Sequence, residues 1–126
     1  FAHEEDHGQP RPDICLGSCA NTPRWLLDSC RDLFLRRGYS VAVDFPYSGC
    51  LVPARYQRDA RVPAVMIEIN RRLYLKPAGR DVYRLGNVPI KLGSFERIRN
   101  DIWSIILRLT QEAECRGAVR GNATLN

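Results

Sequence analysis

Glu68 is the residue of the chain whose surroundings most favour a chemical role. It lies in the run Val65–Ile69 and has apolar neighbours on both sides. Burying an ionised carboxylate is costly unless a cation or a metal ion lies beside it. One interpretation is a catalytic carboxylate in a cleft at a strand end, where α/β sheets place their sites. The other is a structural ion pair with Arg71 or Arg72, and the two interpretations have equal weight because both kinds of site perturb ionisable groups.

Two polar residues follow Glu68 almost at once, Asn70 and Arg71. The planar guanidinium group of arginine suits a substrate carboxylate, which it can bind through two parallel hydrogen bonds. Alternation along a strand puts Glu68 and Asn70 on one face and Arg71 on the other. All three can therefore share a substrate-binding site only at the end of the strand. The alternative role for Arg71 is to neutralise Glu68.

A second candidate site is the loop from Phe45 to Gly49, which follows a valine-rich run. Ser48 and Gly49 are small groups at the end of a predicted strand, where ligand-binding loops are common. We therefore predict that these two residues contribute to substrate binding. The alternative is an ordinary turn built from proline and glycine.

Metal-binding patterns are weak in this chain. His3 and His7 lie with Asp6 in a polar stretch, where histidines are more often solvated than ligated. Five cysteines form an odd set, and we expect reduced thiols, as in a cytoplasmic protein. Cys15 and Cys19 have the spacing C-x-x-x-C, but no second pair follows at zinc-finger spacing. We therefore predict no metal site on this chain alone.

Length and charge restrict the class of protein. The 126 residues, 44% of them hydrophobic, suit one compact domain with a buried core. The net charge is +5, but the basic residues are spread out and are not interleaved with aromatic side chains. This pattern argues against nucleic-acid binding and is compatible with a small anionic substrate. No apolar run approaches the roughly 20 residues of a membrane-spanning helix, so we predict no membrane association.

The elements that would position these residues can be read from the hydrophobic pattern. The pattern predicts a parallel strand–helix–strand unit. Its strands cover Asp13–Gly17 and Tyr39–Phe45, and its helix starts at Thr22, the predicted N-cap, and is followed by a left-handed Gly38. A long loop separates this unit from a third, central strand over 65–75. The predicted fold is α/β, as part of a mostly parallel sheet with flanking helices.

The rest of the chain is predicted to hold turns and one more helix. Residues 77–93 contain three glycines and two prolines, which indicates turns and a small hairpin. An apolar stripe with Ser94 as N-cap predicts a helix over 94–116, ended by Gly117. We divide the chain into a polar lead-in over 1–12, one domain portion over 13–117 and a flexible tail over 118–126.

Five segments occur in an order that resembles the N-formylglutamate amidohydrolase family. They are P-D-I-C-L-G, N-T-P-x-W-L, G-Y-S-V-A-V-D-F-P-Y-S-G, L-V-P and V-M-I-E-I-N-R-x-L-Y-L, which together cover residues 12–75. The resemblance implies a fold similar to zinc-dependent exopeptidases and the hydrolysis of N-formyl-L-glutamate to formate and L-glutamate in histidine degradation. Glu68 matches the carboxylate that activates the zinc-bound water, and Asn70 and Arg71 match positions that hold the substrate.

The same resemblance places the zinc ligands of the family in a segment before Phe1, one of them in a D-x-H-S motif. We therefore expect a C-terminal portion that is inactive alone, holds no zinc, and pairs with a missing N-terminal half or self-associates. Asn21 stands where the family often has histidine. Two other readings stay open: a related N-acyl amino-acid amidohydrolase, and a non-catalytic α/β domain that binds an anionic ligand or a protein partner.

Overall fold

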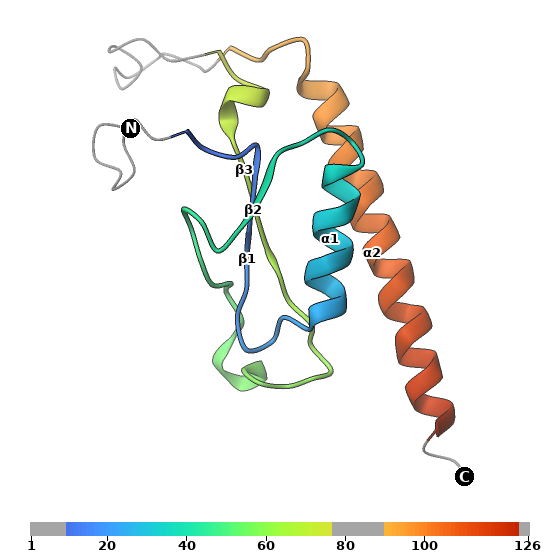
Figure 1. Ribbon diagram of the computed structural model, residues 1–126. Coiled ribbons are helices and arrows are strands. Elements are labelled where there is room, and N and C mark those ends of the chain that lie inside the picture. The colour runs from blue at the N-terminus through green and yellow to red at the C-terminus, as the bar shows by residue number, and fades with distance from the viewer. Residues whose placement is uncertain (1–9, 77–89, 124–126) are drawn as a thin grey trace.

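The fold is a three-stranded sheet with two helices on one side of it. The computed structural model describes residues 10–76 and 90–123, the last six of them as backbone only. Both helices lie on the same side of the sheet, to its right in Figure 1. None of the helices in these ranges combines the length and the apolar character needed to cross a membrane. The elements in chain order are β1 (Ile14–Gly17), α1 (Arg24–Leu35), β2 (Val41–Val43), η1 (Ala54–Tyr56), β3 (Met66–Ile69), η2 (Arg71–Leu73) and α2 (Phe95–Ala123), where η marks a 3₁₀ helix.

The sheet has the strand order β2-β1-β3, so β1 is the central strand. β1 and β2 are parallel, with Ile14 opposite Val41, as the strand–helix–strand pattern predicts. β3 is antiparallel to β1, with Cys15 opposite Glu68. The α/β class is therefore confirmed, but the described sheet is mixed. The prediction of a mostly parallel sheet with the third strand at its centre is wrong.

The direction of β3 follows from where the preceding loop ends. Parallel pairing leaves β1 and β2 with their carboxyl ends at the same edge of the sheet. The backbone N–H of Ala64 donates to the carbonyl of Asn21, 3.0 Å away, just beyond that end of β1. β3 therefore starts beside Gly17, which is opposite Met66, and has to run back along β1.

β3 is shorter than predicted because Asn70 starts a 3₁₀ turn. The Asn70 side chain accepts from the backbone N–H of Arg72 and thereby caps η2. Asn side chains commonly favour such turns over extended backbone. Beyond the turn, Leu75 forms an isolated antiparallel bridge with Lys91, which fits the ends of a hairpin. The residues of the predicted hairpin between 77 and 89 lie outside the described part of the chain.

Helix α1 packs as its apolar spacing predicts. Leu26, Cys30 and Phe34 are its buried residues, and Gly38 has the predicted left-handed φ, +83°. The predicted N-cap is wrong: Pro23 occupies that position, and no side chain caps the helix. Thr22 instead donates its hydroxyl to the Ala64 carbonyl at 2.7 Å, so it holds the loop before β3.

Helix α2 continues further than predicted. It runs through Gly117 to Ala123, where the prediction ended it at Arg116. An interior glycine costs about 1 kcal/mol relative to alanine, and this cost does not end the helix here. One local contact that supports the last turns is the ion pair between Arg116 and Glu112, at 2.9 Å and one helical turn apart.

The core lies between β1 and the two helices. Ile14 and Leu16 of β1 meet Phe34 of α1 and Ile105 of α2, and none of the four is more than 1% exposed. Ile67 of β3 packs against the same cluster. Successive strand residues point to opposite faces. Cys15 and its partner Glu68 therefore point away from the helices.

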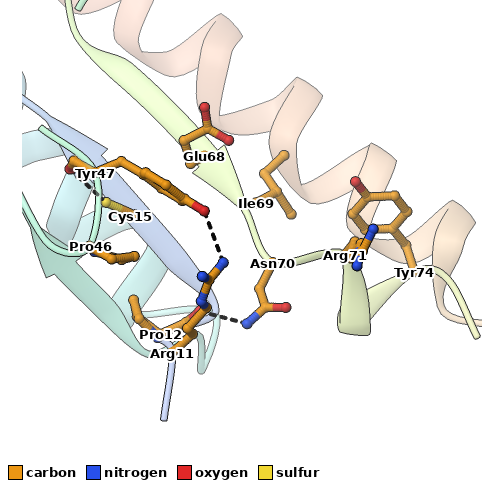
Figure 2. A pocket seen from close by; sticks show the side chains of 10 residues that line it. All are labelled: Arg11, Pro12, Cys15, Pro46, Tyr47, Glu68, Ile69, Asn70, Arg71 and Tyr74. Carbon is orange, nitrogen blue, oxygen red and sulfur yellow. Dashed lines mark hydrogen bonds between the residues drawn. The ribbon is translucent and has the colours of Figure 1, made fainter. Parts of the chain in front are cut away.

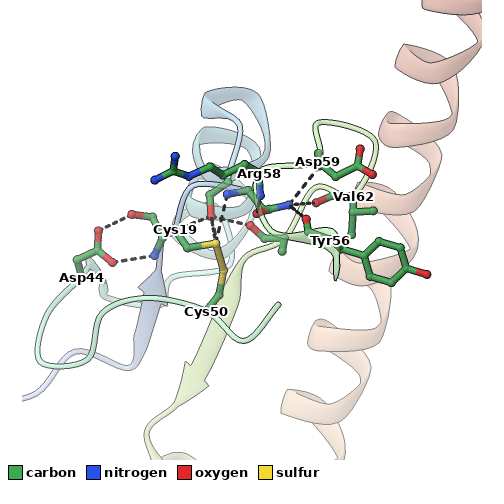
Figure 3. The surroundings of a disulfide bond; sticks show 11 residues. Cys19, Asp44, Cys50, Tyr56, Arg58, Asp59 and Val62 are labelled. Atoms are coloured by element: carbon green, nitrogen blue, oxygen red, sulfur yellow. Dashed lines mark hydrogen bonds between the residues drawn. A yellow bond between two sulfur atoms is a disulfide. The ribbon is translucent and has the colours of Figure 1, made fainter. Parts of the chain in front are cut away.

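A disulfide joins Cys19 to Cys50 (Figure 3). Cys19 follows β1 and Cys50 follows β2, and the parallel pairing of these strands brings their ends together, with the two Cα atoms 5.7 Å apart. The prediction of reduced thiols is wrong for this pair. Cys15 and Cys30 are buried free thiols, as predicted, and burial raises the pKa of the Cys30 thiol to about 12.

Candidate active site

A cavity of about 360 Å³ opens on the face of the sheet that the helices leave uncovered. Its walls come from three places: the residues before β1, the loop after β2, and the end of β3 with η2. Figure 2 shows these side chains gathered around the end of β3. The lining residues are Arg11, Pro12, Cys15, Pro46, Tyr47, Glu68, Ile69, Asn70, Arg71 and Tyr74.

Glu68 reaches this cavity from β3. It is exposed, since β3 is an edge strand in the described sheet and the side chain points away from the core. The expected burial of the carboxylate is therefore wrong. Within residues 10–76 and 90–117, no ion pair joins Glu68 to Arg71 or Arg72; Arg72 pairs with Asp13 instead, at 2.9 Å. A carboxylate without a structural cation in a small cavity can accept a proton from a water molecule.

Arg71 also lines the cavity, from the first position of η2. A strand continued past Ile69 would have sent Arg71 to the face opposite Glu68. Because the backbone leaves the strand at Asn70, both residues border one space. The structure thus brings Glu68 and Arg71 together by the means expected from the sequence, the end of the strand.

Asn70 lies between them and uses its amide to hold backbone. Its Nδ2 donates to the carbonyl of Pro12 at 3.1 Å, and its Oδ1 accepts from the N–H of Arg72 at 3.2 Å. Its own N–H donates to the carbonyl of Asp13 at 2.8 Å. Asn70 therefore anchors the segment before β1 to the end of β3, and these contacts give it a positioning role in the site.

The loop after β2 lines the cavity, but through other residues than the two predicted. Ser48 and Gly49 are not among its lining residues, whereas Pro46 and Tyr47 are. Gly49 has a left-handed φ of +80° and lets its carbonyl lie against Gly17, a contact that a Cβ on Gly17 would block. The loop thus borders the cavity through Pro46 and Tyr47, while Gly49 determines the path of its backbone.

Asp44 holds the start of this loop. Its carboxylate accepts from the backbone N–H of Ser18 at 2.7 Å and from the Ser18 hydroxyl at 2.6 Å. These hydrogen bonds lower the pKa of Asp44 below its ordinary value. The Cys15 thiol donates to the carbonyl of Tyr47 at 3.1 Å, so the loop is tied to β1 at two points.

Seven of the ten cavity residues are absent from the predicted site, and four of these seven have a polar or sulfur-containing side chain: Arg11, Cys15, Tyr47 and Tyr74. Arg11 donates to the hydroxyl of Tyr47 at 2.9 Å, and its guanidinium lies 5.5 Å from the centre of that ring. These two residues are 36 positions apart, so no local pattern signals their contact. Tyr47 was within reach of prediction, because it lies in the loop already chosen for its position.

The side chain of Asn21, the position at which the resemblance led us to consider a histidine, binds backbone groups of a neighbouring loop. It is 7% exposed, and its Nδ2 lies within hydrogen-bond distance of the carbonyls of Tyr56, Asp59 and Val62, at 2.8, 3.1 and 3.1 Å. Its Oδ1 accepts from the N–H of Arg58 at 2.7 Å. Figure 3 shows these carbonyls converging beside the disulfide. The side chain organises the loop between η1 and β3.

The described residues do not fit a catalytic zinc. Such a site needs three protein ligands and an open position, and residues 10–76 and 90–117 bring no three His, Cys, Asp or Glu side chains together in that way. His3 and His7, the candidates from the sequence, lie outside the described residues.

Comparison with known proteins gives two findings. The sequence model of the family described as N-formylglutamate amidohydrolase matches residues 1–75, more than half of the chain. The crystal structure of N-formylglutamate amidohydrolase from Ralstonia eutropha JMP134 is similar, with a TM-score of 0.67 and 26% sequence identity. The similarity covers 87% of this chain but 37% of that one. No curated protein matches. With the ordered motifs and the match over residues 1–75, the chain belongs to the N-formylglutamate amidohydrolase family.

Proposed function

We propose that this chain contributes the general base and part of the substrate site to an enzyme that hydrolyses N-formyl-L-glutamate to formate and L-glutamate. The observation that carries the proposal is the cavity at the end of β3 that both Glu68 and Arg71 line. The family supports the reaction class. The chain spans only 37% of the similar structure, so the activity is proposed for the full-length gene product.

Glu68 is the proton acceptor in this mechanism. Its carboxylate takes a proton from the water that attacks the formyl carbon, and the C–N bond then breaks as the same group returns the proton to the leaving nitrogen. General acid–base catalysis of this kind contributes typically ~100- to 10,000-fold to the rate. The exposed position on an edge strand gives water and substrate access to the carboxylate.

Arg71 binds a carboxylate of the substrate in this proposal, and Asn70 fixes the turn that presents it. Zinc remains part of the proposal for the complete enzyme. Its ligands would have to come from residues other than those described, since these do not fit the ion. The assigned roles of Glu68 and Arg71 concern proton transfer and substrate binding, and they hold for any means of activating the carbonyl group.

The decisive experiment is Glu68→Gln in the full-length gene product, assayed for formate release. Glutamine keeps the shape but cannot accept the proton, so we expect kcat to fall by about 100- to 10,000-fold. The melting temperature should stay near that of the wild type, since Glu68 is exposed and has no ion pair with the neighbouring arginines. Turnover of N-formyl-L-glutamate by Glu68→Gln at nearly the wild-type rate would end the assignment.

Arg71→Lys is the companion variant, since it keeps the charge but removes the two-point contact. We expect it to raise KM more than it lowers kcat. A full-length wild-type protein that binds N-formyl-L-glutamate but releases no formate would favour the alternative of a non-catalytic ligand-binding domain.

A further inference from the structure

Helix α2 has an apolar face that the described residues leave exposed. Its core face, which includes Ile105 and Leu109, is buried in the cluster shared with β1 and α1. Trp103, Ile106 and Leu107 are instead 63%, 41% and 45% exposed. α2 is also the outermost described element on the helix side of the sheet (Figure 1). Single exposed apolar residues are ordinary, but adjoining ones commonly mark a contact surface.

These exposed side chains belong to a longer stripe along α2. Residues three and four positions apart lie on the same side of a helix, and this spacing runs from Arg99 to Glu114, each member being exposed. We call this set the outer stripe; it consists of Arg99, Trp103, Ile106, Leu107, Thr110 and Glu114. The outer stripe has an apolar centre and one charge at each end, and the two charges are opposite in sign.

The outer stripe is complementary to itself. Its midpoint falls between Ile106 and Leu107, and Arg99 and Glu114 lie at equal distances from that midpoint in opposite directions. In a two-fold symmetric interface, each residue contacts the residue that contacts it from the other copy. Two copies packed antiparallel about the midpoint therefore bring Arg99 of each copy beside Glu114 of the other. A parallel pair would bring like charges together at both ends, which is unfavourable.

The side chains of the outer stripe suit such a contact. Arg99 pairs with Glu96 at 2.7 Å, but both side chains are exposed, and an exposed ion pair contributes little to stability. The guanidinium group has five N–H donors, so it can bind a second carboxylate as well. Trp103 would lie beside Thr110 of the other copy. Tryptophan and arginine are the residue types that most often dominate the binding energy of an interface.

We infer that the protein forms a two-fold symmetric dimer in which the outer stripes of two α2 helices pack antiparallel. The two apolar centres form the core of the interface, and an Arg99–Glu114 ion pair lies at each end, the usual arrangement of an apolar core with a polar rim. The inference does not depend on the proposed function, because the cavity lies on the face of the sheet that the helices leave uncovered.

Analytical ultracentrifugation of the full-length gene product tests the dimer. We expect a dimer whose dissociation constant is micromolar or lower. Trp103→Ala should raise that constant about 100-fold or more, because the symmetric interface loses the ring twice. The control is Leu35→Ala, at a leucine of α1 that is 49% exposed, and it should change nothing. A monomer at about 100 μM, as when another segment of the same polypeptide covers the stripe, would overturn the inference, and so would a dimer that Trp103→Ala leaves intact.

Charge reversal tests the antiparallel register. Arg99→Glu and Glu114→Arg each place like charges at both ends of the interface, so each should raise the dissociation constant about tenfold. The double variant Arg99→Glu/Glu114→Arg restores opposite charges across the interface and should recover most of the affinity. Arg108→Glu, at an exposed position of α2 outside the outer stripe, is the control. Single variants that dimerise like the wild type, or a double variant no better than the single ones, would contradict the inference.

Discussion

The two faces of β1 are closed in different ways. Ile14 and Leu16 face the helices and are sealed by apolar side chains of α1 and α2. Cys15, between them, is also buried, but on its side the thiol donates to the Tyr47 carbonyl of a loop. Arg11 and Asn70 add further polar contacts there. The helix side therefore holds the fold together, while the other side can vary its chemistry without loss of the core.

Phe34→Ala should show the largest effect on stability. Phe34 is fully buried on the helix side, where it packs edge-to-face against Tyr39. Removal of a buried phenylalanine ring costs about 3–5 kcal/mol in free energy of unfolding. The control is Leu35→Ala, the next residue of α1, which is 49% exposed and should change stability by no more than about 0.5 kcal/mol. Denaturant unfolding measures both, and equal losses would show that burial against the helix side of β1 does not account for the stability.

The disulfide tests how much the loop side contributes. Its two cysteines are 31 positions apart, and closing a loop of that length in the unfolded chain corresponds to about 3–4 kcal/mol. The double variant Cys19→Ser/Cys50→Ser should lose a comparable amount of stability. Cys115→Ser, at an exposed free cysteine, is the control. A double variant as stable as the wild type would show that the helix side alone sustains the fold.

Asp13 joins Ser40, before β2, to Arg72 of η2 and should show the smallest effect, one that depends on pH. Burial acts to raise the pKa of its carboxyl, but hydrogen bonds from Ser40 and Arg72 outweigh burial and lower it. A lowered pKa means that the stabilisation is present above the unfolded value, about 3.9, and is lost as the pH falls through the folded value. Asp13→Asn should cost about 1 kcal/mol at pH 7.

Melting of wild type and Asp13→Asn at several pH values between 7 and 2 provides the measurement for that prediction. The difference in melting temperature should shrink below about pH 4, because Asp13 of the wild type then takes up a proton and loses the charge that the asparagine variant already lacks. A difference that stays constant down to pH 2 would show that Asp13 contributes through shape and not through charge.

Local patterns predict the elements and the parallel pairing of β1 with β2, but they do not predict how β3 joins the sheet. The periodicity of α1 and the left-handed Gly38 are local properties, and both predictions are confirmed. The direction of β3 depends on where a long loop delivers the chain, which no local pattern records. The Cys19–Cys50 pair likewise depends on the parallel ends of β1 and β2. The sequence predicts reduced thiols because the five cysteines form an odd set, and this count cannot show which two of them meet in the fold.

The candidate site divides in the same way. The sequence predicts roles for Glu68 and Arg71 because it shows a carboxylate among apolar neighbours and an arginine that soon follows. Arg11 was not selected, since its contact with Tyr47 exists only after β1 and β2 have paired. The sequence predicts that Asn70 binds substrate because its amide can bind a ligand. Only the structure shows the hydrogen bonds of that amide to Pro12 and Arg72.

The hydrogen bonds of Asn21 have a consequence for insertions and deletions. One buried amide is shared by the carbonyls of Tyr56, Asp59 and Val62. These carbonyls recur at intervals of three residues, so one residue added or removed between them would turn at least one carbonyl away from the amide. Surface loops commonly tolerate changes of length, but in this loop the number of residues between Tyr56 and Val62 is fixed. Homologues that keep an asparagine here should keep the length of residues 56–62 as well, however much the side chains between them differ.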